Sequence, residues 1–126
     1  MNMLERVYDY LTDAGLLNDW TTQMQFWHDT GNGNEQFIVI QSNGGTQVRD
    51  NLGSDYYFSV YVIGKRGAYN VSDVDAKANE IIEYVKSTPL DSCLNYVQMQ
   101  APLGRPMLSE EGRPIHELLL RVVFGE

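Results

Sequence analysis

The chain has 126 residues and a net charge of -8. Its length is sufficient for one domain that buries a core without disulfides or metals. Its acidic balance argues against nucleic-acid binding through phosphate contacts and against docking on an anionic membrane. We expect a single domain over residues 1–126, with no cofactor. We also expect no membrane segment, because no stretch approaches the roughly 18 apolar residues that a membrane helix needs.

The N-terminal third predicts a helix followed by two strands. Asn2 to Ala14 carries apolar residues at helical spacing, and Gly15 is a suitable helix end. Thr22 to His28 and Phe37 to Gln41 are each typical of a short strand. The turn signal Asn32-Gly33 lies between them, so the two strands are predicted to form a hairpin.

The middle of the chain predicts a central strand and a second helix. Apolar groups fall on both faces of Tyr56 to Ile63, which favours a strand covered on both sides. Ser72 is predicted to begin the helix, with its hydroxyl capping the amide of Asp75. One apolar stripe follows, and Pro89 is predicted to end the helix. The stripe consists of Val74, Ala78, Ile81 and Val85.

Two further strands are predicted, over Leu94 to Gln100 and Ile115 to Phe124. The element order is then α-β-β-β-α-β-β, in which strands outnumber helices and follow one another closely. This order favours an α+β domain, with a mostly antiparallel sheet of about five strands and two helices packed on one face.

The sequence gives little support to catalysis. His28 and His116 lie far apart and outside any metal-spacing motif, so we expect them to be surface or strand-end residues. Cys93 is the single cysteine, which precludes an intramolecular disulfide and favours a small core residue. A metal-dependent nuclease site could be built only from residues with unspecific spacing, namely Asp50, Asp55 and Lys65.

The few basic residues lie in or beside predicted loops. Arg49 lies in the polar loop 42–55, and Arg105 and Arg113 lie in the Pro/Gly-rich segment before the last strand. On an acidic protein such residues suit contacts with a neighbouring copy, although solubility explains each of them about as well. The predicted contact residues are Arg49, Arg105, Glu110, Glu111 and Arg113.

Three segments carry a family resemblance: YYFSVYVIG (56–64), DVDAKANEIIEYVKS (73–87) and PLGRPMLSEEGRPIHELLLRVVFGE (102–126). Together they resemble the small tail-terminator or minor tail proteins of long-tailed bacteriophages and prophages. The resemblance covers roughly Phe37 to the C-terminus. Its most specific part is the Pro-Leu-Gly-Arg loop with the acidic-Gly-Arg turn that leads into the last strand. The region Leu16 to His28, with Trp20 and Trp27, has no counterpart in it.

The resemblance implies a structural subunit rather than an enzyme. Such subunits form a ring, usually of six copies, that caps the head-proximal end of the tail tube, ends tube polymerisation and provides a surface for head joining. The implied partners are further copies of the chain, the major tail-tube protein and a head-completion protein. DNA passes through the lumen without specific binding. The implied location is the head–tail junction of the virion, and the host cytoplasm during assembly.

Two alternatives remain open. A small acidic inhibitor or immunity-type protein would also be rich in carboxylates, and it would stay monomeric and bind a basic partner tightly. Another head–tail neck component would copurify with the portal protein rather than with the tail tube.

Overall fold

The computed structural model describes residues 3–45, 54–67, 70–91, 95–101 and 103–124, so Arg49, Asp50 and Cys93 lie outside the described residues. The elements, in chain order, are α1 (Met3–Asp13), β1 (Thr21–Met24), β2 (Phe37–Gly45), β3 (Ser54–Ile63), α2 (Val71–Ser87), β4 (Leu90–Asp91), β5 (Asn95–Met99), β6 (Met107–Leu108) and β7 (Pro114–Phe124). Both predicted helices and all five predicted strands are present. The strands β4 and β6, of two residues each, are additional.

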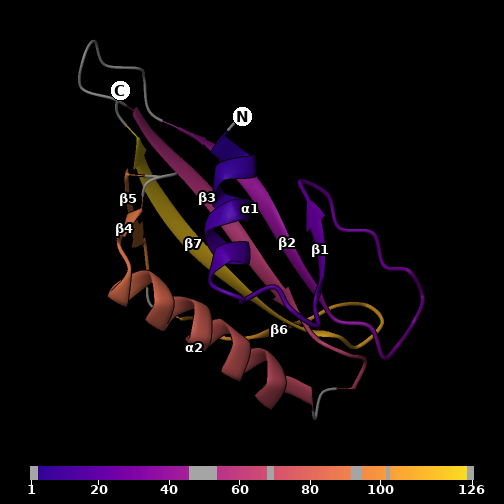
Figure 1. Cartoon of the computed structure of the whole chain (residues 1–126). Coiled ribbons are helices and arrows are strands. Elements are labelled where there is room, and N and C mark those ends of the chain that lie inside the picture. The colour runs from indigo at the N-terminus through magenta and orange to yellow at the C-terminus, as the bar shows by residue number, and fades with distance from the viewer. Residues whose placement is uncertain (1–2, 46–53, 68–69, 92–94, 102, 125–126) are drawn as a thin grey trace.

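The described strands form one sheet in the order β1-β2-β3-β7-β5-β4, and β6 pairs with the start of β7 (Figure 1). Every pairing is antiparallel except that of β1 with β2. Both helices pack on the same side of this sheet. The predicted α+β class, with two helices on one face of a mostly antiparallel sheet, is therefore confirmed. We call the other side of the sheet the open face.

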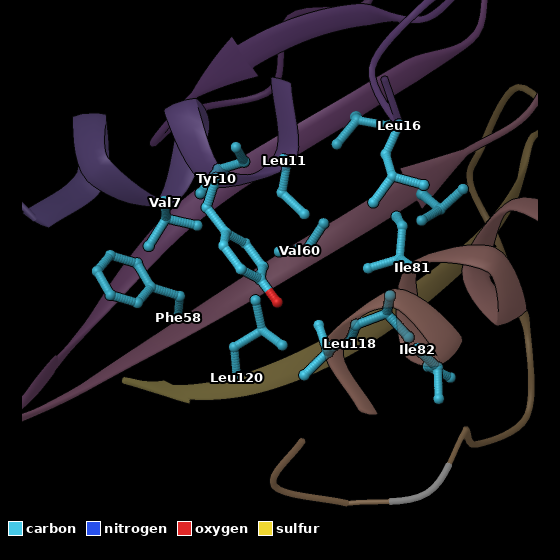
Figure 2. Close-up of a cluster of buried hydrophobic side chains, with 14 of the residues drawn as sticks. Val7, Tyr10, Leu11, Leu16, Phe58, Val60, Ile81, Ile82, Leu118 and Leu120 are labelled. Atoms are coloured by element: carbon cyan, nitrogen blue, oxygen red, sulfur yellow. The ribbon is translucent and has the colours of Figure 1, made fainter. Parts of the chain in front are cut away.

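The main hydrophobic core lies between the helices and the sheet (Figure 2). The predicted stripe of α2 is buried, since Val74, Ala78, Ile81 and Val85 are each at most 1% exposed. The sheet contributes alternate residues of its inner strands, namely Ile38, Ile40, Phe58, Val60, Val62, Val97, Leu118, Leu120 and Val122. This alternation gives the sheet one continuous apolar side.

A hydrogen bond ties α1 to the end of α2 across this core. The Tyr10 hydroxyl donates to the carbonyl of Thr88 at 2.7 Å, and the Tyr10 ring lies 5.1 Å from the ring of Tyr84. Tyr10 is fully buried, so its hydroxyl needs such a partner. The two helices, far apart in sequence, are thereby fixed to each other as well as to the sheet.

The strands β3 and β7 form the centre of the sheet and pair from Ser54↔Phe124 to Ile63↔Ile115. Val60 and its alternate neighbours face the helices, whereas Tyr61 and Ile63 belong to a second, smaller cluster on the open face. The predicted division of this strand into two faces and its central position are confirmed.

The predicted hairpin between the first two strands is wrong, because β1 runs parallel to β2. β1 ends at Met24, where Gln25 has a φ of 67° and the Phe26 amide donates to the Met24 carbonyl at 2.7 Å. This is a γ-turn of the strained kind. The connection 25–36 then passes around the β1 edge of the sheet and starts β2 at the same end as β1 (Figure 1). Asn32-Gly33 is a turn within this connection.

The start of α2 also differs from the prediction. The helix begins at Val71 and its N-cap is Asn70, so Ser72 does not cap it. The side-chain amide of Asn70 donates to the carbonyl of Arg66 at 2.7 Å and closes the loop before the helix. The predicted end is confirmed, because α2 ends at Ser87 and Pro89 follows shortly after.

Candidate assembly surfaces

The segment 100–113, which we call the late arm, connects β5 to β7. Within its described part, β6 pairs with the first two residues of β7, in the register Met107↔Ile115 and Leu108↔Pro114. Met107 is 50% exposed and Leu108 is 61% exposed. The late arm is therefore fixed to the start of β7 while it presents two large apolar side chains to solvent.

Three predicted contact residues lie exposed on the late arm, namely Arg105, Glu110 and Glu111. Their exposure is compatible with a contact role, which remains a prediction. Arg49 lies outside the described residues.

Arg113 is different, because its side chain is 0% exposed. Its Nε donates to Oδ2 of Asp29 at 3.1 Å, and its Nη1 donates to the carbonyl of Gly64 at 3.0 Å. Its Nη2 donates to the carbonyl of Asn32 at 2.6 Å, and Nη1 also donates to the carbonyl of Glu35. Arg113 therefore fastens the connection 25–36 to the start of β7.

The burial of Arg113 corrects its assignment to a contact surface. All the partners described above belong to the same chain, and the guanidinium carbon lies 5.1 Å from the centre of the Phe37 ring beneath it. Such a guanidinium is shielded from any second molecule. The sequence could not reveal this role, because Arg113 and Asp29 are distant in the chain.

Two carboxyl groups in the connection 25–36 are stabilised in their charged form. The backbone amide of Gly31, followed by the Arg113 guanidinium, holds the pKa of Asp29 below its usual value. The Thr30 hydroxyl is the main cause that lowers the pKa of Glu35. Hydrogen bonds to the charged form favour that form.

We expect the fold to lose stability in acid because of these groups. A carboxyl whose pKa is lower in the folded state contributes stability that is complete above its unfolded pKa of roughly 4 and is lost as the pH falls through the folded value. Urea unfolding at pH 7 and at lower pH should show this loss. The Asp29→Asn variant should be less stable than the wild type at pH 7 and should lose less in acid. Equal acid losses in both proteins would contradict the assignment.

A second exposed surface lies on the open face, over the C-terminal half of β7 and the paired strand β5. Tyr96 is 39% exposed and Leu119 is 37% exposed, and strand register places both on this face. We call this surface the end patch, formed by Tyr96, Gln98, Leu119, Arg121 and Val123. The two helices lie on the other side of the sheet, so they do not cover it.

The charged groups of the end patch are held in place. Arg121 donates to Oε1 of Gln98 at 3.2 Å and to Oδ2 of Asp55 at 3.1 Å. Beside the patch, the exposed Glu117 accepts a hydrogen bond from the Ser59 hydroxyl at 2.8 Å. The open face thus presents apolar side chains between an ordered arginine and an ordered glutamate.

The possible reactive residues do not converge. His28 is exposed, whereas His116 lies near the start of β7, is 2% exposed and pairs with Asp75 on α2. The predicted surface or strand-end positions therefore agree with the structure, although His116 is buried. Asp55 and Lys65 lie at opposite ends of β3. Among the described residues, no group of three or more His, Cys, Asp or Glu could hold a metal ion.

A shallow hollow of about 330 Å³ lies beside α2, and Trp20, Lys65, Lys77 and Glu80 help to line it. Its Lys77 is already engaged, because Nζ donates to the carbonyl of Leu16 at 3.0 Å and lies 3.3 Å from a Glu80 carboxyl oxygen. The charge of Lys77 is therefore balanced within the chain, so this lysine would attract an anion only weakly.

The comparisons with known proteins give one family. A family model described as "Phage tail termination protein" matches residues 1–126. A comparison with curated proteins gives no match. One solved structure aligns over 97% of this chain and 91% of its own chain, with a TM-score of 0.46 and 13% sequence identity. At this level of similarity the match gives no information about function. Within the described residues, the helices are too short or too polar to span a membrane.

Proposed function

The chain belongs to the phage tail termination protein family and is a structural component of the phage tail, and from this premise we propose that it forms a ring on the head-proximal end of the tail tube. The ring ends tube polymerisation and provides the surface to which the head is joined. The family match over residues 1–126 is the observation that carries this proposal.

The surfaces of the chain are compatible with a ring. A closed ring uses head-to-tail contacts, so each copy needs two different patches that complement each other. The late arm and the end patch are two such patches, and they lie at different positions along β7. The family match also favours this function over the acidic inhibitor, which would need no self-association.

The charge distribution suits DNA passage. Acidic side chains outnumber basic ones on both α1 and α2, and phosphates are repelled by such surfaces. A duplex in the lumen would therefore pass without strong binding, if this side of the subunit lines the channel.

We expect the purified chain to stop the growth of tail tubes in vitro. Tail-tube protein should be polymerised with and without it, and tube lengths measured by electron microscopy. Tubes that carry the chain should not elongate at the capped end when fresh tube protein is added. An unrelated acidic protein of similar size is the control for charge. Equal elongation at both ends in the presence of the chain would contradict the proposal.

A further inference from the structure

Two exposed surfaces of the chain match each other in polarity and charge. We propose that, in the assembled ring, the late arm of one copy lies along the end patch of the next copy. This inference rests on the proposed ring and names the surfaces that close it. The occupant of the end patch is thus a second copy of this chain.

Gln100, the first residue of the late arm, donates its amide to the Leu119 carbonyl at 2.8 Å, yet the Leu119 side chain remains 37% exposed. The late arm thus leaves the end patch of its own chain exposed. Its strand β6 is held in register with Pro114 and Ile115. Leu119 lies four residues further along β7, which is about 13 Å at the rise of a strand. Within the described residues, β6 of the same chain is thus held away from Leu119, and a second copy can bring its own arm to that position.

Exposed apolar side chains are concentrated on these two surfaces. Among the described residues, the large hydrophobic side chains left exposed are Phe26, Tyr96, Met107, Leu108 and Leu119. All of these except Phe26 belong to the late arm or the end patch. Met107 pairs with Ile115 of the open-face cluster and Leu108 pairs with Pro114, so the two side chains point to opposite faces and only Met107 lies on the open face. Placing arm on patch therefore removes Met107, Tyr96 and Leu119 from water in one contact, which favours association.

The charges are arranged in complementary order. Along the late arm, Arg105 precedes the apolar pair and Glu110 follows it. Along β7, Glu117 precedes Leu119 and Arg121 follows it. An arm that runs in the same direction as the partner's β7 therefore places Arg105 over Glu117, whereas Glu110 comes to an Arg121 that is already paired with Asp55. Complementary charges of this kind fix the register of a contact.

The remaining surface is less suited to a contact between copies. Both helices present an excess of carboxylates on the other side of the sheet, and two such surfaces repel each other. On the open face, the charge of Arg121 is balanced by Asp55. Copies of this acidic chain can thus approach most closely through the open face.

Disulfide trapping tests the contact directly. In a Cys93→Ser background, the variants Met107→Cys and Leu119→Cys are prepared separately, mixed, and oxidised. Non-reducing gels and mass spectrometry should show a shift from monomer to a disulfide-linked dimer in the mixture, and no such shift with either variant alone. A chain that carries both substitutions should give a ladder of linked copies.

Asn79→Cys, at an exposed position on α2, replaces Leu119→Cys in the matched control and should give no linked dimer with Met107→Cys. Equal linkage with Asn79→Cys, linkage within one variant alone, or no linkage in the mixture would overturn the inference. Tube growth measured on the wild-type chain distinguishes the two failures. If the wild type stops tube elongation but no disulfide-linked dimer forms, the ring closes through other surfaces. If the wild type does not stop tubes, the proposed function fails as well.

Discussion

Replacing Arg113 with methionine is expected to lower the free energy of unfolding by about 1–3 kcal/mol, the range for leaving a buried hydrogen-bonding group without its partner. The methionine fills similar space but donates no hydrogen bond. It removes the bonds from Arg113 to Asp29 and to the carbonyls of Asn32, Glu35 and Gly64. Asp29 keeps the Gly31 amide and the Asn32 carbonyl keeps the Glu35 amide. Urea unfolding at pH 7, followed by circular dichroism, measures this loss.

The matched control is Arg105→Met, which makes the same chemical change on the exposed part of the late arm. Exposed substitutions of this kind usually change stability by less than about 0.5 kcal/mol. Equal stability of the two variants would show that the buried network around Arg113 contributes little. A charge change at Arg113 therefore reports on the fold and cannot serve as a test of ring contacts.

Replacing Leu118 with alanine is expected to lower the free energy of unfolding by about 2–5 kcal/mol, through lost burial and the cavity that remains. Leu118 is 1% exposed and lies in the core beneath the helices, close to Ile81 and Ile82 (Figure 2). Thermal and urea unfolding of the purified variant give the measurement.

The neighbouring residue provides the control. Leu119 is the next residue of β7, but it faces the open side and is 37% exposed. Leu119→Ala should leave the isolated chain close to wild-type stability, because little buried area is lost. If the two alanine variants lost similar stability, the assignment of the two faces of β7 would be contradicted.

Regular patterns in the sequence predicted the regular parts of the fold. The stripe from Val74 to Val85 identified the buried side of α2, because spacing along a helix decides which residues share a face. The alternation in Tyr56 to Ile63 identified the two sides of β3 for the same kind of reason. These properties are local, so a single sequence contains them.

Other features depend on contacts between distant residues, and the sequence could not provide them. The turn signal Asn32-Gly33 is real, but the direction of β1 is decided by the turn at Gln25 and by the bonds from Arg113. The run Leu118–Leu120 consists of three identical residues, so the sequence does not show that only Leu119 faces outward. The end patch was therefore missed, whereas the exposed charges of the late arm were found.

The position of β7 has a consequence for how the chain folds during synthesis. β7 lies between β3 and β5 in the sheet, although it follows both of them in the sequence. Until the ribosome has released residues 114–124, no strand of the sheet connects β3 to β5. Such long-range pairing forms slowly and leaves unpaired edges that can aggregate or recruit chaperones. A nascent chain without β7 therefore lacks a complete sheet.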